Sequence, residues 1–190
     1  MMELNRCRWA DPASEIYIAY HDQEWGRPEH DDRKLFEMLI LEGFQAGLSW
    51  LTILKKREAF RRAFDGFNPA AVAEYGPEKF DALMNDPGIV RNRRKIEASA
   101  QNARVFLNIQ REFGSFDRYL WGFTNSQVIL NTDDQVRASS ELSDRVSADL
   151  KRRGMKFVGT VIIYSFLQAV GVVNDHETGC WCYPHPNQQP

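Results

Sequence analysis

The sequence predicts an all-α fold, and two observations lead to that prediction. Apolar residues recur with the period of an amphipathic helix in two long segments, at Leu35, Phe36, Leu39 and Ile40 and then at Ile96, Ala103, Phe106 and Leu107. The alternation of apolar and polar residues that marks a half-buried strand is scarce. With 190 residues, 43% of them hydrophobic, the chain can bury a core as a single domain over 1–190, built as one unit or as two lobes.

Capping residues place the boundaries of two short helices. Asn68 followed by Pro69 is an N-cap with proline at the first helical position, and we expect a short helix to begin there and to end at Gly76. Pro77 then opens the next helix.

A helix-hairpin-helix element is predicted at about residues 80–106. Its centre, LMNDPGIVRNRRKI at 83–96, contains a Pro-Gly turn in which Gly88 permits a tight bend. Main-chain N–H groups at the start of the following helix can hold a phosphate of DNA. Charge would be added by the basic residues Arg91, Arg93, Arg94 and Lys95. An ordinary αα-hairpin with a basic surface explains the same pattern.

The last third of the chain predicts two further helices. The first spans about 140–153 and stops at Gly154, and an apolar helix over about 157–172 follows it. The polar segment 124–139 has no clear period, so we expect it to be an exposed connection.

Composition limits the classes of function. The net charge of -2 gives no global sign of nucleic-acid binding, so a contact with DNA would have to come from local basic clusters. The N-terminus lacks the apolar core of a signal peptide. The strongest apolar run, 157–173, is interrupted by polar residues and falls short of a membrane span. We therefore expect a cytoplasmic protein without membrane contact.

Two pairs of cysteine and histidine lie at opposite ends of the chain. Cys7 and His21 are near the start, whereas His176 and Cys180 are near the end and have H-x-x-x-C spacing. Thiolate and imidazole are ligands of tetrahedral zinc, so one ion could tie the two terminal segments together. The alternative is that two half-buried thiols and two surface histidines have no shared role.

The segment from 18 to 50 combines aromatic and polar residues at high density. An extruded DNA base needs flat faces for stacking and a few polar atoms that read its edge. Candidate faces are Trp9, Tyr17, Tyr20, Trp25, Phe44 and Trp50. Each of these side chains could equally belong to the core.

Glu42 is the carboxylate of greatest interest in this segment. Three aliphatic residues precede it and Gly43 follows, so apolar neighbours would partly remove it from water. A carboxylate in that environment can favour a cationic ring beside it. Leu48 could act as a wedge in the base stack. A solvent-edge position for Glu42 and a core position for Leu48 are the alternatives.

Five motifs together carry a resemblance to a known family. They are YHDQEWG at 20–26, LEGFQAGLSW at 41–50, KKR at 55–57, GMKFVGT at 154–160 and VNDHETGC at 173–180. The chain resembles the 3-methyladenine DNA glycosylase I family, over residues 7–184. Such enzymes extrude 3-methyladenine from alkylated DNA and hydrolyse its N-glycosidic bond in base excision repair.

The resemblance implies a helix-hairpin-helix glycosylase fold with one structural zinc ion and no organic cofactor. The implied ligands, which would join the N- and C-terminal segments, are Cys7, His21, His176 and Cys180. Glu42 is the implied catalytic and base-recognition carboxylate, and the implied base-contacting aromatics are Trp9, Tyr17, Tyr20 and Trp50, with Trp25 nearby. DNA contacts are expected at the hairpin, over 88–95, and at Leu48. We expect a monomer that binds double-stranded alkylated DNA and releases free 3-methyladenine.

Two rival interpretations keep the same residues. The first is a non-catalytic helical protein that binds damaged DNA and contains structural zinc. The second gives zinc a catalytic role, but four protein ligands would leave no position for water. Cys182 and His185 complicate this count because either could replace a ligand.

Overall fold

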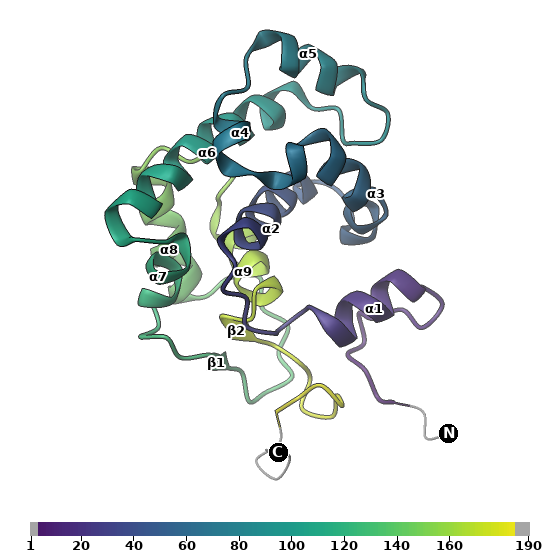
Figure 1. Ribbon diagram of the computed structural model, residues 1–190. Coiled ribbons are helices and arrows are strands. Elements are labelled where there is room, and N and C mark those ends of the chain that lie inside the picture. Colours follow the sequence, from purple (N-terminus) through teal and green to yellow (C-terminus); the bar gives the residue numbers. More distant parts are fainter. Residues whose placement is uncertain (1–3, 185–190) are drawn as a thin grey trace.

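The structure is a computed structural model that describes residues 4–184, and helices make up most of it (Figure 1). In chain order the elements are α1 (Glu15–Gln23), α2 (Asp32–Gln45), α3 (Trp50–Ala63), the 3-10 helix η1 (Asp65–Phe67), α4 (Pro69–Ala73), α5 (Pro77–Asn85), α6 (Arg93–Phe113), α7 (Phe116–Gly122), β1 (Ile129–Leu130), α8 (Glu141–Arg152), α9 (Thr160–Ala169) and β2 (Val173–Asn174). None of the helices within 4–184 is both long and apolar enough to cross a membrane.

Helix α2 lies at the centre of the fold. All of its residues from 35 to 44 are buried, and it packs against α3, α6, α7 and α9. Asp31 caps its start by accepting a hydrogen bond from the main-chain N–H of Lys34 at 2.9 Å. The predicted apolar faces are confirmed for both long helices, with only Leu107 half-buried among Leu35, Phe36, Leu39, Ile40, Ile96, Ala103, Phe106 and Leu107.

The predicted helix starts at Asn68 and Pro77 are confirmed. The Asn68 side chain accepts a hydrogen bond from the Ala70 N–H at 3.0 Å, and Pro69 occupies the first turn of α4. Helix α4 ends at Ala73, before the predicted stop at Gly76, and α5 begins at Pro77.

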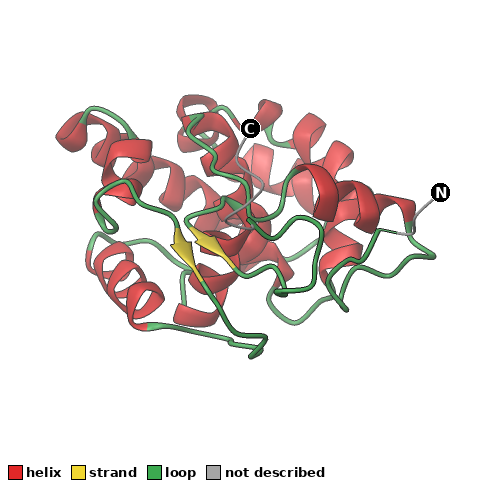
Figure 2. Cartoon of the chain, turned by 90° about the horizontal axis from the view of Figure 1, so that it is seen from below, coloured by secondary structure: helices red, strands yellow, loops and turns green. Residues whose placement is uncertain are grey.

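The expectation of an all-α chain is wrong at one place. Strands β1 and β2 pair in parallel, with Ile129 opposite Val173 and Leu130 opposite Asn174 (Figure 2). The Ile129 N–H donates to the Val172 oxygen at 2.9 Å. The pair is only two residues long, so neither strand shows the alternation by which a longer strand is recognised. The segment 124–139 therefore includes a strand within an otherwise largely exposed connection.

Helix α9 is shorter than predicted. It spans Thr160–Ala169 instead of about 157–172, because Phe157 has a left-handed φ of 55° and cannot continue a helix there. Gly154, with φ 102°, ends the preceding helical segment as predicted.

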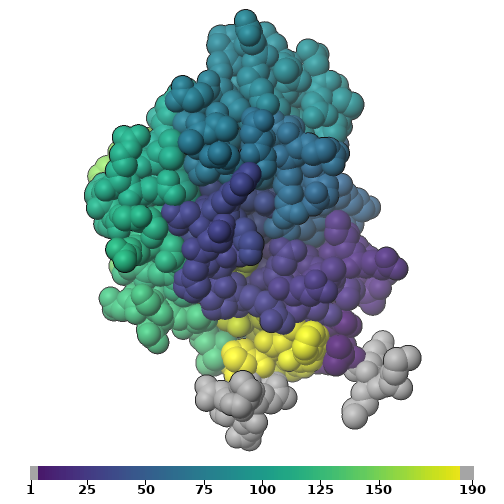
Figure 3. All heavy atoms as spheres, viewed as in Figure 1, coloured from purple at the N-terminus to yellow at the C-terminus, as the bar shows by residue number. Residues whose placement is uncertain are grey.

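The segments before α1 and after β2 lie on the same side of the molecule, opposite α5 (Figure 1). In the space-filling view, the yellow C-terminal surface borders the purple N-terminal surface (Figure 3). The Trp181 N–H donates to the Asn5 oxygen at 2.9 Å, and the Asn5 side chain donates to the Gly179 oxygen at 2.6 Å. The expected approach of the two terminal segments is thus present.

Candidate functional site

A cavity of about 480 Å³ opens between α1, α2, α3 and α9. Its lining residues are Trp9, Tyr17, Tyr20, Trp25, Glu42, Gln45, Trp50, Val136, Arg137, Ser165 and Gln168. The five predicted base-contacting aromatics and Glu42 therefore share one cavity. Phe44, which was also a candidate face, belongs to the core instead and packs on Phe60.

The aromatic wall is built around Trp9. Its ring lies 5.6 Å from that of Tyr17 and 5.0 Å from that of Trp25, both edge-on, while Tyr20 lies 5.5 Å from Trp50. The Tyr17 hydroxyl accepts a hydrogen bond from the Leu51 N–H at 3.2 Å, which ties α1 to the start of α3. Edge-on packing leaves ring faces available to a flat ligand.

Glu42 projects into this cavity from the last turns of α2. The residue is only 3% exposed, and its Oε2 has no hydrogen-bond partner among the described residues. Burial raises the pKa of Glu42 to about 8. Because the low-polarity surroundings disfavour the charged form, a cation placed beside this carboxylate would stabilise it.

Two donors accompany that acceptor. The indole N–H groups of Trp9 and Trp50 are buried and make no hydrogen bond within residues 4–184. Buried polar groups usually have partners, and unpaired ones need an explanation. An acceptor and two donors on the lining of one aromatic cavity are suited to a planar ligand with polar edges.

Sequence reasoning missed five residues of the lining. They are Gln45, Val136, Arg137, Ser165 and Gln168. Gln168 donates to Asp175 at 2.6 Å, and Arg137 pairs with Asp133 at 2.7 Å. Gln45 lies within the 41–50 motif, whereas the other four come from the connection after β1 and from α9. Only the tertiary structure brings those segments beside α1, so no local signal could have identified these four residues.

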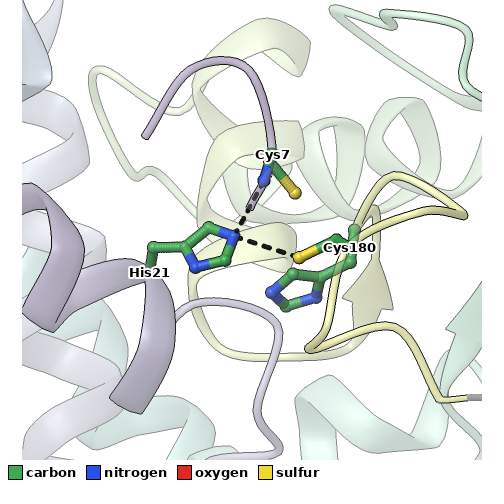
Figure 4. A group of neighbouring side chains, drawn as sticks. Cys7, His21 and Cys180 are labelled. Atoms are coloured by element: carbon green, nitrogen blue, oxygen red, sulfur yellow. Dashed lines mark hydrogen bonds between the residues drawn. The ribbon is translucent and has the colours of Figure 1, made fainter. Parts of the chain in front are cut away.

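The four predicted ligands form a buried cluster. The Sγ atoms of Cys7 and Cys180 and one ring nitrogen each of His21 and His176 lie within 4.8 Å of one another. Figure 4 shows Cys7 and Cys180 approaching His21 from opposite ends of the chain, with His21 Nε2 3.4 Å from the Cys180 sulfur. This donor set and closeness fit a tetrahedral metal ion.

Neighbouring groups orient the two imidazoles. His21 Nδ1 lies 2.7 Å from an oxygen of Asp22, and His176 Nδ1 lies 3.0 Å from the Asn174 side-chain oxygen. These contacts leave Nε2 of each ring to bind a metal, and His176 Nε2 is buried without a partner among the described residues. The Glu177 N–H donates to the Cys7 sulfur at 3.3 Å.

Cys182 and His185 were the two residues that could replace a metal ligand. Cys182 is half-buried and groups with His21 and Asp22 rather than with the four-residue cluster. His185 lies outside the described residues.

The hairpin between α5 and α6 spans residues 86–92. Asp86 accepts a hydrogen bond from the Gly88 N–H at 2.7 Å, and Ile89 is buried. A Cβ atom at Gly88 would lie 2.9 Å from the Ala59 side chain on α3, so glycine allows the close approach. Lys56 of α3 donates to the Pro87 oxygen at 3.0 Å, which fastens the turn.

The four basic residues at the end of the hairpin and the start of α6 divide into three groups. Arg91 and Arg94 are exposed, and no ion pair of either is found within 4–184. Arg93 pairs with Asp81 and with Glu97. Lys95 is buried and its Nζ donates to main-chain oxygens, so the expectation of a surface contact with DNA is corrected for this residue.

Leu48 lies on the loop between α2 and α3. Its side chain is 42% exposed, which removes the core interpretation. Gly47 precedes it and Ser49 caps α3 by accepting from the Thr52 N–H, so a short and well-anchored loop presents an apolar side chain to solvent.

Comparisons with known proteins agree with this geometry. A sequence model described as methyladenine glycosylase matches residues 9–183. The chain is 50% identical to DNA-3-methyladenine glycosylase 1 of Escherichia coli (strain K12), over 95% of this chain and 98% of that protein. It is 43% identical to the DNA-3-methyladenine glycosylase of Haemophilus influenzae (strain ATCC 51907 / DSM 11121 / KW20 / Rd), covering 93% and 97% respectively.

Solved structures give the same result. A crystal structure of 3-methyladenine DNA glycosylase I has a TM-score of 0.91 and 48% identity, covering 95% of this chain and all of that one. The enzyme from Staphylococcus aureus, solved to explain its recognition of 3-methyladenine, also has a TM-score of 0.91, at 38% identity and 97% and 99% coverage. The chain belongs to the methyladenine glycosylase family.

Proposed function

We propose that this chain is a DNA-3-methyladenine glycosylase, which hydrolyses the N-glycosidic bond of 3-methyladenine in alkylated DNA during base excision repair. Family membership, with curated relatives of that name, supports the activity. The observation that carries the assignment of the site is the buried, unpaired Glu42 in an aromatic cavity.

The proposed mechanism begins with extrusion of the damaged base. Methylation at N3 gives the adenine a positive charge. A cationic ring between aromatic faces gains cation-π attraction, and the ionised carboxylate of Glu42 adds charge complementarity. Undamaged adenine is neutral and would leave that carboxylate buried without a partner. The cavity therefore favours the methylated base.

Cleavage of the N-glycosidic bond then needs no proton donor from the protein. The positive charge already makes the base a good leaving group, so no general acid is required. As the N-glycosidic bond breaks, the positive charge moves from the ring to the sugar. An ionised Glu42 near the base stabilises that positive charge on either group. Water completes the reaction at the sugar carbon. We propose Glu42 as the catalytic residue on this basis.

We also propose that the Cys/His cluster holds one zinc ion with a structural role. The residues fit the metal in number, type and burial. Four protein ligands saturate a tetrahedral ion, so it would fasten the segment that carries Trp9 rather than activate water.

DNA contact is proposed for the helix-hairpin-helix element and for Leu48. Exposed Arg91 and Arg94 and the start of α6 would hold phosphates, and Leu48 would enter the base stack. The buried apolar side chains form one contiguous cluster, which supports a single domain, and we propose that it acts as a monomer. Within residues 4–184 the cysteines Cys7, Cys180 and Cys182 form no disulfide, and we propose a cytoplasmic location.

One assay tests the function. The protein is incubated with methylated double-stranded DNA, and the released bases are identified; we expect free 3-methyladenine. Glu42→Gln keeps the shape of the side chain and should slow release at least about a hundredfold while binding to undamaged duplex changes little. DNA bound without release of any base by the unaltered protein would favour the non-catalytic alternative.

A further inference from the structure

Lys95 differs from the neighbouring basic residues Arg91, Arg93 and Arg94 because its side chain turns inward. The residue is 8% exposed, and its Nζ donates hydrogen bonds to the main-chain oxygens of Phe44 at 2.9 Å and Ala46 at 2.8 Å. Burial lowers the pKa of Lys95. A buried ammonium group is unfavourable unless acceptors match its donors, and here two carbonyls do so.

These acceptors lie at the end of the helix that carries Glu42. Helix α2 ends at Gln45, and Ala46 is its C-cap residue. The last carbonyls of a helix have no partner within the helix, and the helix dipole favours a cation beside them. Glu42 belongs to the same final turn, and Leu48 follows Ala46 by two positions.

The backbone of Lys95 belongs to the first turn of α6. Its main-chain N–H donates to the Asn92 side chain, which caps the helix, at 3.2 Å. This is the turn to which we assign the contact with DNA phosphates. One residue therefore connects the turn that would hold the DNA backbone with the helix end beside the base cavity.

We propose that Lys95 is a positioning residue that holds the end of α2, with Glu42 and Leu48, against the DNA-contacting turn of α6. When the hairpin binds the phosphates of a duplex, this contact sets where Leu48 meets the base stack, and so how readily a paired base is extruded toward Glu42. Lys95 acts through these residues and touches neither DNA nor base. The inference rests on the proposed function.

The test compares paired and unpaired substrates. Methylated poly(dA), alone or annealed to poly(dT), presents 3-methyladenine without or with the need to open a base pair. Single-turnover rates of base release are measured on both with enzyme in excess. Lys95→Met removes the charge and the donors but keeps the length of the side chain. We expect the rate on the duplex to fall about tenfold and the rate on the single strand to change less than about twofold.

Lys79→Met is the matched control. The Lys79 ammonium pairs with Asp65 at 3.2 Å and lies over the Tyr75 ring, apart from the cavity lining. The ratio of duplex to single-strand rates in Lys79→Met should equal that of the unaltered protein. Two results would each overturn the inference. One is an unchanged ratio of duplex to single-strand rates in Lys95→Met, whether or not both rates fall; the other is a fall of that ratio in Lys79→Met as large as in Lys95→Met.

A second variant covers the case in which Lys95→Met does not fold. Asn92→Ala removes only the acceptor that caps the first turn of α6, and it should lower the same ratio to a smaller extent. An unchanged ratio in that variant would also overturn the inference. If the unaltered protein releases no 3-methyladenine from either polymer, the proposed function itself fails.

Discussion

The indole ring of Trp25 lies edge-on to the imidazole of His176, with the ring centroids 4.7 Å apart and the planes at 72°. Trp25 lines the aromatic cavity, whereas His176 belongs to the Cys/His cluster. A second ring contact, tilted at 60°, joins Trp9 to His21, with centroids 5.3 Å apart. The aromatic wall of the cavity therefore rests directly on the candidate metal ligands.

Loss of the metal should destabilise the protein. We expect about one zinc ion per chain, measured by atomic absorption, and expect Cys180→Ser or a strong chelator to lower the melting temperature by about 10 °C. Cys182→Ser is the matched control and should keep both metal and melting temperature, because the Cys182 sulfur lies outside the four-residue cluster. A metal-free protein with an unchanged melting temperature would refute the structural role.

Base release should depend on pH through Glu42. Burial raises the pKa of this carboxyl to about 8, and the proposed role needs its ionised form. The value of kcat/KM on methylated duplex should therefore rise with pH by about tenfold per unit below the pKa and level off above it. Glu42→Gln should lack this dependence. A flat profile in the unaltered protein across the pKa would exclude an ionised Glu42 as the requirement.

Glu42 should also make the fold less stable as pH rises. Its folded pKa of about 8 exceeds the ordinary value of 4.5, so the folded protein retains a proton that the unfolded chain loses. The stabilising contribution is complete below about pH 4.5 and is lost as pH rises through about 8. Glu42→Gln should therefore be more stable than the unaltered protein by on the order of 3 kcal/mol at pH 8, and nearly equal to it near pH 4.5. Urea unfolding at both values measures this difference, and a gain that is the same at both would contradict the assignment.

The arginines of the hairpin should contribute unequally to DNA binding. Arg94 is exposed without an ion pair in the part of the chain described, whereas Arg93 is held by Asp81 and Glu97. Arg94→Ala should weaken binding to any duplex and reduce the slope of log K against log salt by about 1. Arg93→Ala should change the slope less, since its charge is already neutralised. Fluorescence anisotropy over a salt series distinguishes the two, and equal slopes would contradict this difference.

Leu48→Ala should separate activity from stability. The side chain is 42% exposed, so its truncation should change the free energy of unfolding by less than about 0.5 kcal/mol. Base release from duplex should nevertheless fall about tenfold, because unstacking of the target is no longer assisted. An unchanged rate of base release from duplex would contradict the role of Leu48 in the base stack.

Much of the candidate site could be predicted because it lies in short, contiguous motifs. Tyr20, His21 and Trp25 share one motif, and Glu42 and Trp50 share another, so their chemistry can be recognised locally. Their convergence on one cavity follows from α3 packing against both α1 and α2. Arg137 and Gln168 could not be predicted, since no pattern links the connection after β1 or α9 to this cavity.

The sequence by itself determined the helical class, the helix starts at Asn68 and Pro77, and the chemical types gathered in the site. These properties depend on local periodicity, on capping and on residue identity. Only the tertiary structure decided the pairing of β1 with β2 and the direction of Lys95. A basic side chain near a hairpin looks the same in sequence whether it faces solvent or a helix end. The carbonyls of Phe44 and Ala46, about fifty residues away in the chain, draw it inward because buried acceptors require a donor.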